Sequence, residues 1–316
     1  MAMLQNYERK TAEIREQFLA LKKAEPERFR KRLTLSFSTW MFGGEPLEAS
    51  LKRLKAAGLD YVELPGNHQT PDLGWKPAEV RKRLADYGMK VAGICGLYDP
   101  ETDLASDSPY RRQRAIDYLR REIECAAEVG AEYIIVVPSA VGRPDPLDEG
   151  EYWRSVEAVR NVAQDFLAAG IKAAVEPIRS AEVSLIHTIE QAQQYIKDVD
   201  HPGISHLNGD IYHMLNEEEH VGAAILQAGA QLVNLHLADT NRGPLGRGMM
   251  DVDVVVMALY LLGYNSPGRF VTGEALGIGG NPYALMKAAK NTELFDQIVQ
   301  QTIGCFRERE EYVLSL

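Results

Sequence analysis

Short apolar runs alternate with amphipathic stretches from residue 33 to the end of the chain. Runs such as AEYIIVVPS at 131–139 are almost continuously apolar, which is typical of strands covered on both faces. The stretches between them repeat apolar residues every three or four positions, which is typical of helices with one buried face. Several of these stretches end in a glycine just before the next run, a common helix stop. The expected strands are 32–39, 60–66, 89–96, 131–139, 171–177, 203–210, 231–239 and 268–275.

This alternation predicts one α/β domain, a single (β/α)₈ TIM barrel over residues 33–316. The expected helices are 46–58, 76–88, 110–130, 149–170, 184–199, 218–229, 252–264 and a C-terminal helical tail at 293–310. No change in composition after residue 32 marks a linker, and a chain of 316 residues suits one barrel.

Residues 1–32 are predicted to form an N-terminal helical arm. A narrow apolar seam at helical spacing runs along it before Pro26 interrupts the pattern. The seam consists of Leu4, Tyr7, Thr11, Ile14, Phe18 and Leu21. Two interpretations remain open, because such a seam fits a helix that packs on its own barrel and equally one that docks on another subunit.

Composition narrows the function classes. A formal net charge of −10 argues against nucleic acid and against an anionic membrane surface as partners. No stretch approaches the length of apolar sequence that a membrane span needs, and the N-terminus does not have the pattern of a secretory leader. Three cysteines, Cys95, Cys125 and Cys305, lie far apart, so we expect buried thiols and a cytoplasmic location.

Residues of metal-ligand type follow apolar runs in the second half of the chain. They are Glu176, Asp210, His236 and Glu274. Successive members of this set are about one βα unit apart, so every ligand would come from its own repeat. The carboxyl ends of barrel strands open on one face, where we expect these side chains to meet. Such an oxygen-rich set predicts a divalent metal, with Mn²⁺ first and Mg²⁺ or Co²⁺ as alternatives.

Glu176 and Glu274 are the candidate catalytic residues. They fall on the fifth and eighth expected strands, on roughly opposite sides of the barrel mouth. Two carboxylates placed so can remove a proton from one face of a carbon and return it to the other. A metal that coordinates the neighbouring oxygens would stabilise the enediolate that forms. The competing interpretation is that each glutamate only pairs with a nearby lysine or arginine.

Other polar and aromatic residues are candidates for substrate binding. Arg242 lies in a glycine-rich loop, and His213 follows Asp210 at D-x-x-H spacing; each could instead only stabilise its loop or helix. Glu182 could accept a sugar hydroxyl or cap the next helix. Trp40 could face the sugar or pack in the core. His68 lies near Glu63, which ends the second expected strand.

Four segments resemble the metal site of the xylose isomerase-like barrel superfamily, and best its ketose 3-epimerases of the tagatose and allulose type. They are VEP at 175–177, NGDIYHM at 208–214, HLADTNRGPLGRG at 236–248 and GEA at 273–275. The resemblance spans about 33–310. It implies metal ligation by Glu176, Asp210, His236 and Glu274, proton exchange by the two glutamates, and substrate binding by Glu182, His213 and Arg242.

Two features depart from simple epimerases. Leu207-Asn208-Gly209-Asp210 stands where the family usually has Leu-Asp-Thr, which leaves the register of the aspartate open. The arm and the segment after Glu274 look more like the catalytic subunit of bacterial C-glycoside deglycosidases. Those enzymes cleave the C–C glycosidic bond of 3-oxo-glycosides together with a small β-rich partner subunit.

The sequence therefore predicts a metal-dependent enzyme that acts next to the carbonyl of a sugar. Ketose 3-epimerisation is the first hypothesis, and C-glycoside cleavage is the alternative. We expect a homo-oligomer, or a hetero-oligomer with a smaller subunit if the alternative holds. Two further classes are disfavoured: a related DNA-repair endonuclease, because the chain has only seven histidines and is acidic, and a barrel that only binds ligands, because the ligand set is intact.

Overall fold

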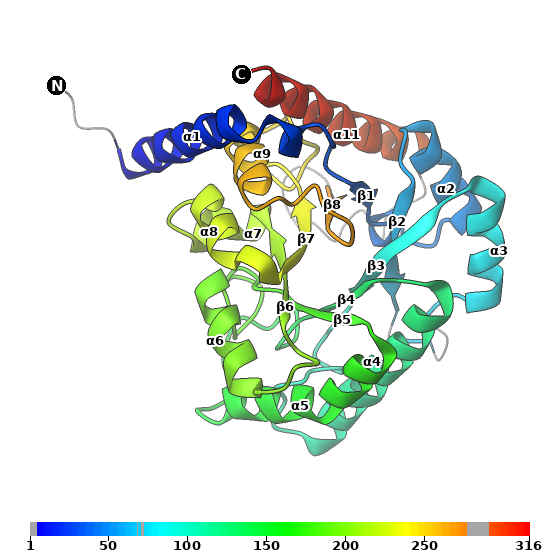
Figure 1. Cartoon of the computed structure of the whole chain (residues 1–316). Helices are drawn as coiled ribbons and strands as arrows, with labels where there is room; N and C mark the ends of the chain where they lie inside the picture. The colour runs from blue at the N-terminus through cyan, green and yellow to red at the C-terminus, as the bar shows by residue number, and fades with distance from the viewer. Residues whose placement is uncertain (1–4, 68, 71–72, 277–290) are drawn as a thin grey trace.

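A parallel barrel dominates the computed structural model, which describes residues 5–67, 69–70, 73–276 and 291–316 (Figure 1). Eight parallel strands follow the order β1-β8-β7-β6-β5-β4-β3-β2. They are β1 Leu35–Phe37, β2 Tyr61–Gly66, β3 Lys90–Gly96, β4 Tyr133–Val136, β5 Lys172–Val175, β6 His206–Asp210, β7 Leu232–Leu237 and β8 Phe270–Gly273. The remaining seam, between β1 and β2, is bridged at Ser38 and Glu63, where the Thr39 amide donates to the Glu63 carbonyl at 3.0 Å. The predicted barrel is confirmed.

Helices surround the strands, as Figure 1 shows. They are α1 Asn6–Ala24, α2 Leu47–Ala56, α3 Pro77–Tyr87, α4 Pro109–Val129, α5 Glu151–Ala169, α6 Ile189–Val199, α7 Ile211–Glu217, α8 Val221–Ala228, α9 Val252–Leu261 and α11 Thr292–Ser315. Short 3₁₀ turns are η1 Pro26–Phe29, η2 Trp40–Phe42 and η3 Gly229–Gln231. Among the described residues, no helix is both long and apolar enough to cross a bilayer.

Local sequence explains these boundaries. The four residues of β4 are Tyr, Ile, Ile and Val, and all are buried between the barrel interior and the surrounding helices. Gly130 and Gly170 adopt left-handed backbone conformations at the ends of α4 and α5, where a residue without a side chain fits best. The side chain of Thr188 accepts the amide of Gln191 and caps α6. This helix therefore starts at Ile189, later than the start at 184 that its apolar pattern predicts.

The arm packs on the barrel of its own chain. In Figure 1, α1 lies beside α9, and the C-terminal helix α11 packs against α9 as well. Phe18 is fully buried, with its ring 5.3 Å from that of Phe29 and 6.5 Å from that of Tyr260 on α9. Buried Glu310 of α11 accepts both the Leu33 amide and the Tyr260 hydroxyl at 2.9 Å. Of the two interpretations of the seam, packing on its own barrel is the one observed. Leu4 lies outside the described residues, and the division into arm and barrel domains stays a prediction.

We expect Phe18→Ala to lower the free energy of unfolding by about 3–5 kcal/mol, because it leaves a cavity between α1 and α9. The neighbouring Leu19 is 37% exposed. Leu19→Ala should therefore change stability by no more than about 0.5 kcal/mol. Chemical denaturation followed by circular dichroism measures both. Equal losses for the two variants would show that the arm does not pack as described.

Candidate functional site

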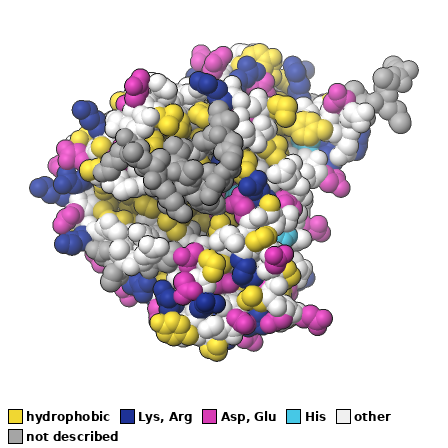
Figure 2. Space-filling view, turned by 180° about the vertical axis from the view of Figure 1, so that it is seen from behind, with side chains coloured by type: hydrophobic (Ala, Val, Ile, Leu, Met, Phe, Trp, Pro, Cys, Tyr) yellow, Lys and Arg dark blue, Asp and Glu magenta, His cyan; other side chains and the backbone are white. Residues whose placement is uncertain are grey.

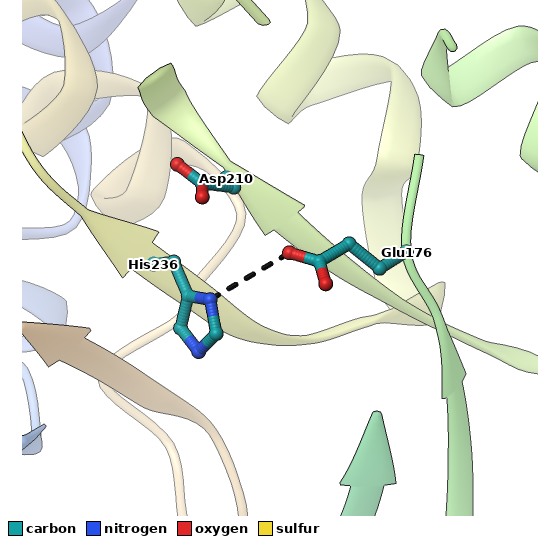
Figure 3. A group of neighbouring side chains, drawn as sticks. All are labelled: Glu176, Asp210 and His236. Carbon is teal, nitrogen blue, oxygen red and sulfur yellow. Dashed lines mark ion pairs between the residues drawn. The ribbon is translucent and has the colours of Figure 1, made fainter. Parts of the chain in front are cut away.

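Three of the four predicted metal ligands meet at the carboxyl ends of adjacent strands. Glu176 follows β5, Asp210 ends β6 and His236 lies in β7, paired in register with Asp210. One ligand atom from each lies within 4.8 Å of the others, and all three residues are buried. In Figure 3, Glu176 and His236 point toward each other, and Asp210 lies next to them. Asp210 itself therefore faces this group, which is consistent with the register that the prediction assumes.

Glu274, the fourth predicted ligand, adjoins this group from the end of β8. Its Oε2 lies 3.1 Å from Nδ1 of His236, and Glu176 Oε1 lies 3.6 Å from the same nitrogen. Glu274 is therefore next to the cluster, although it is not part of the set whose atoms all fall within 4.8 Å. Oε1 of Glu274 accepts the indole N–H of Trp40 at 2.7 Å.

The two glutamates have opposite protonation tendencies. Burial raises the pKa of Glu176 to about 7, with His236 opposing the shift and the Glu274 carboxylate adding to it. Burial also favours the neutral form of Glu274, but His236 and the Arg242 guanidinium outweigh it and lower the pKa well below its ordinary value. Two neighbouring carboxyl groups whose pKa values differ in this way are suited to acid–base chemistry, because one favours the protonated form and the other the ionised form.

Arg242 bridges two of the carboxylates. Its Nη1 donates to Asp210 and its Nη2 to Oε2 of Glu274 at 2.5 Å, while the guanidinium lies 4.7 Å from the ring centre of Tyr212. The residue has a positive φ. That conformation is strained for a side chain of this size. The loop that imposes it is held by Asp239, whose carboxylate accepts the amides of Gly246 and Met250.

His213, on the first turn of α7, lies beside Asp210. Its Nε2 is 3.4 Å from Oδ2 of that aspartate, and it lines the cavity above the site. Burial lowers the pKa of His213, which favours the neutral form of the ring. Its Nδ1 is buried and has no hydrogen-bond partner among the described residues. An unpaired buried nitrogen at a cavity wall suits a substrate hydroxyl.

A cavity of about 820 Å³ opens over these residues. Its polar end contains Glu176, His213, Arg242 and Glu274. Its other walls are largely apolar and aromatic, and include Trp40, Trp75, Leu97, Tyr98 and Val141. On the face drawn in Figure 2, the described acidic and basic side chains are interspersed with one another.

The other predicted substrate-binding residues differ in where they lie relative to the cavity. Trp40 is buried in η2, lines the cavity and donates to Glu274, so it does more than fill the core. Glu182 pairs with Arg179 and is not among the residues that line the cavity; α6 is capped by Thr188 instead. His68 lies outside the described residues.

Sequence reasoning missed the polar side chains that support the ligands. Asn208 donates to Oε1 of Glu176 at 2.8 Å, and both carboxylate oxygens of Glu63 lie 3.1 Å from Nε2 of His236. Glu63 is a charged residue inside the apolar strand β2, as His236 is inside β7, so a similar signal was available for it. Asn208 was interpreted only as a departure from the family pattern.

The residues fit a hard divalent cation. Three carboxylates and one imidazole converge, and oxygen donors with one nitrogen suit Mn²⁺ or Mg²⁺ better than a structural zinc site. Both glutamates are positioned by a side-chain donor, Asn208 for Glu176 and Trp40 for Glu274. The carboxylates of metal sites are commonly held in this way. The fold and site thus define a (β/α)₈ barrel with a buried cluster at its carboxyl face that could hold a metal ion.

The chain belongs to the xylose isomerase-like TIM barrel family, whose profile matches residues 51–274. It is 29% identical over 231 residues to the ketose 3-epimerase of Arthrobacter globiformis, covering 72% of this chain and 78% of that one. It is 28% identical over 222 residues to the 3-dehydro-D-guloside 4-epimerase of Escherichia coli, covering 66% and 80%. A solved L-ribulose 3-epimerase superposes with a TM-score of 0.77 at 22% identity, covering 89% and 96%. The predicted superfamily is confirmed, and the protein is an enzyme.

We expect the wild-type chain to bind one divalent ion, and Asp210→Ala or His236→Ala to weaken binding more than about 100-fold, since even losing an outer partner of a ligand costs about 10–100-fold. Titration of metal-stripped protein with Mn²⁺ measures this. Glu122→Gln is a matched control, because Glu122 is a fully buried carboxyl group of α4 that is not part of the Glu176, Asp210 and His236 group. Unchanged affinity in Asp210→Ala would refute the assigned ligand set.

Proposed function

We propose that the protein is a divalent-metal-dependent ketose 3-epimerase. The observation that carries the proposal is the pair of buried glutamates, Glu176 and Glu274, which approach the same nitrogen of His236 from β5 and β8. A substrate carbon between them would present one face to each carboxyl group. The relatives support this choice of reaction, because the ketose 3-epimerase of Arthrobacter globiformis matches across most of both chains.

Each glutamate has a distinct task in this scheme. One takes the proton from C3 and the other supplies a proton to the opposite face, which inverts the centre. Asn208 fixes the oxygen of Glu176 and the indole of Trp40 fixes that of Glu274. Neither carboxyl group therefore has to be oriented during the reaction. Glu176, Asp210, His236 and Glu274 would hold the metal, Mn²⁺ by preference. When bound, such an ion makes the C–H next to a carbonyl more acidic by polarising the sugar oxygens.

Neighbouring residues would bind the sugar. His213 offers its unpaired Nδ1, and Arg242 places a guanidinium at the edge of the cluster, where it can donate to sugar oxygens. The apolar wall around Trp40 limits water at the reacting carbon. We also propose that Glu182 contributes to substrate binding indirectly, by holding Arg179 in an ion pair. The guanidinium of Arg179 lies 4.8 Å from the ring centre of Tyr212. Self-assembly and a cytoplasmic location stay predictions.

We expect Glu176→Gln and Glu274→Gln each to lower kcat for epimerisation about 10²–10⁴-fold, the usual contribution of a positioned acid or base. Epimer formation from D-tagatose, D-fructose and L-ribulose in D₂O, with deuterium located by NMR, measures inversion and exchange at C3 separately. Glu132→Gln is the control, because Glu132 lies at the opposite end of the barrel, paired with Lys172. Full inversion in either site variant would contradict the two-carboxylate scheme.

A specific observation favours a second candidate, action on a 3-oxo-glycoside. The cavity has a volume of about 820 Å³, and one wall is aromatic and apolar. This volume is toward the upper end of the sizes that ligand sites usually have. A glycoside would place its sugar at the polar end and its aglycone along Trp75, Leu97 and Tyr98. The Escherichia coli relative is named for a 3-dehydro-guloside, which has this glycosidic form. The relatives are epimerases, so the comparisons do not support C–C cleavage, which remains the lyase alternative.

Trp75→Ala separates these two substrate classes. If the aglycone lies on this indole, kcat/KM for a 3-oxo-glycoside with an aromatic aglycone should fall about tenfold, the scale of one aromatic contact. Activity on free ketoses should change little. Product analysis distinguishes a 4-epimer from a released aglycone, and the lyase also predicts a co-purifying small β-rich partner. Turnover of free ketoses alone would eliminate the second candidate.

A further inference from the structure

A layer of buried polar side chains lies inside the barrel, directly beneath the metal-ligand cluster. Its members are Glu63 of β2, Tyr133 of β4, Asn208 of β6, Asn234 of β7 and Thr272 of β8, and each is fully buried. Barrel interiors are usually filled by branched apolar residues, and buried polar groups cost free energy unless they are paired. The hydrogen bonds within this layer offset that cost, and their arrangement indicates what the layer does.

The donors of this layer point in one direction, toward the glutamates. Thr272 donates to Oδ1 of Asn234 at 2.7 Å, and Nδ2 of Asn234 donates to Oδ1 of Asn208 at 2.8 Å. Nδ2 of Asn208 then donates to Oε1 of Glu176 at 2.8 Å. In each asparagine the amide oxygen accepts a hydrogen bond and the amide nitrogen donates one. A flipped amide would lose both bonds, so each side chain has one favoured orientation. The chain ends on one of the proposed metal ligands.

Glu63 is held in the same layer. The hydroxyl of Tyr133 donates to its Oε2 at 2.6 Å, and Nδ2 of Asn234 lies 3.5 Å from the same oxygen. The ring of Tyr133 crosses β3 where Gly93 leaves room, since a Cβ at that position would lie 2.2 Å from the ring. The carboxylate thus has donors on one side and the imidazole of His236 on the other.

The contact between Glu63 and His236 decides which nitrogen can bind a metal. Both oxygens of Glu63 lie 3.1 Å from Nε2 of His236. Carboxylate oxygens accept hydrogen bonds, so this contact favours the N–H of the imidazole on Nε2. A neutral imidazole has one N–H, which leaves the lone pair on Nδ1. Nδ1 is the nitrogen that faces Glu176 and Glu274.

We propose that Glu63 is a positioning residue that holds His236 as the Nε2–H tautomer with Nδ1 as the metal ligand. Carboxylate partners of metal-bound histidines act in this way in other metal sites, fixing both the tautomer and the ring orientation. This role of Glu63 rests on the metal site of the proposed function. Glu63 itself touches neither the ion nor the sugar in this scheme.

Glu63→Gln tests the proposal, because the amide keeps the shape and removes the charge. We expect metal affinity to fall about 10–100-fold, measured by titration of metal-stripped protein with Mn²⁺. Tyr133→Phe keeps the charge of Glu63 and removes only one donor, so its loss should be smaller. Glu122→Gln, another buried carboxyl, should bind as the wild type does. Circular dichroism and thermal melting establish that each variant is folded.

A spectroscopic measurement reports on the tautomer itself and requires no variant of Glu63. In Zn²⁺-loaded wild-type protein labelled with ¹⁵N-histidine, His236 should show a protonated Nε2 and a metal-shifted Nδ1, assigned by the loss of these signals in His236→Gln. The reverse pattern would overturn the proposal, as would Glu63→Gln with unchanged affinity. A wild-type chain that binds no ion would overturn the metal site of the proposed function as well, so the two failures are distinguishable.

Discussion

Four carboxyl groups converge on a single imidazole inside the mouth of the barrel. Glu63 contacts one nitrogen of His236, Glu176 and Glu274 approach the other, and Asp210 lies beside them on the neighbouring strand. Burying that much negative charge is costly unless cations or hydrogen bonds offset it. Within the described residues, Arg242 is the arginine that bridges two of these carboxylates. Arg242 on the strained loop and the indole of Trp40 both donate hydrogen bonds to these carboxylates and so stabilise the buried charge.

The barrel could be predicted from the sequence because its signals are local. Every expected strand overlaps an observed one, as 131–139 does with β4, since apolar runs and helix-ending glycines depend only on neighbours in the chain. The same holds for the placement of Glu176, Asp210 and His236 at strand ends. The short helix α7 was not predicted as an element. Its start depends on the carboxylate of Asp210, which caps it through the Tyr212 amide while also facing the site.

The support beneath the site could not be predicted in the same way. Whether Asn208 or Tyr133 points into the barrel depends on strand register, and a shift of one residue would reverse the side on which each lies. The reach of Tyr133 to Glu63 also depends on Gly93 in the strand between them, a relation among three repeats that no local pattern contains. Glu182 depends on a similar relation: the family motif predicts that it binds the substrate, and in the structure it forms an ion pair with Arg179.

The difference in pKa between the two candidate catalytic glutamates, Glu176 and Glu274, follows from their surroundings and not from their residue type. Both are buried at strand ends, yet Glu274 has the cation of Arg242 and the indole N–H of Trp40, whereas the side-chain donor of Glu176 is the neutral amide of Asn208. A charged partner stabilises the ionised form far more than a neutral one does in a buried site. His236 lowers the pKa of both carboxyl groups, and for Glu274 the guanidinium of Arg242 and the indole of Trp40 lower it further. The asymmetry that the proposed two-base epimerisation would use therefore depends in part on the loop after β7 that carries Arg242.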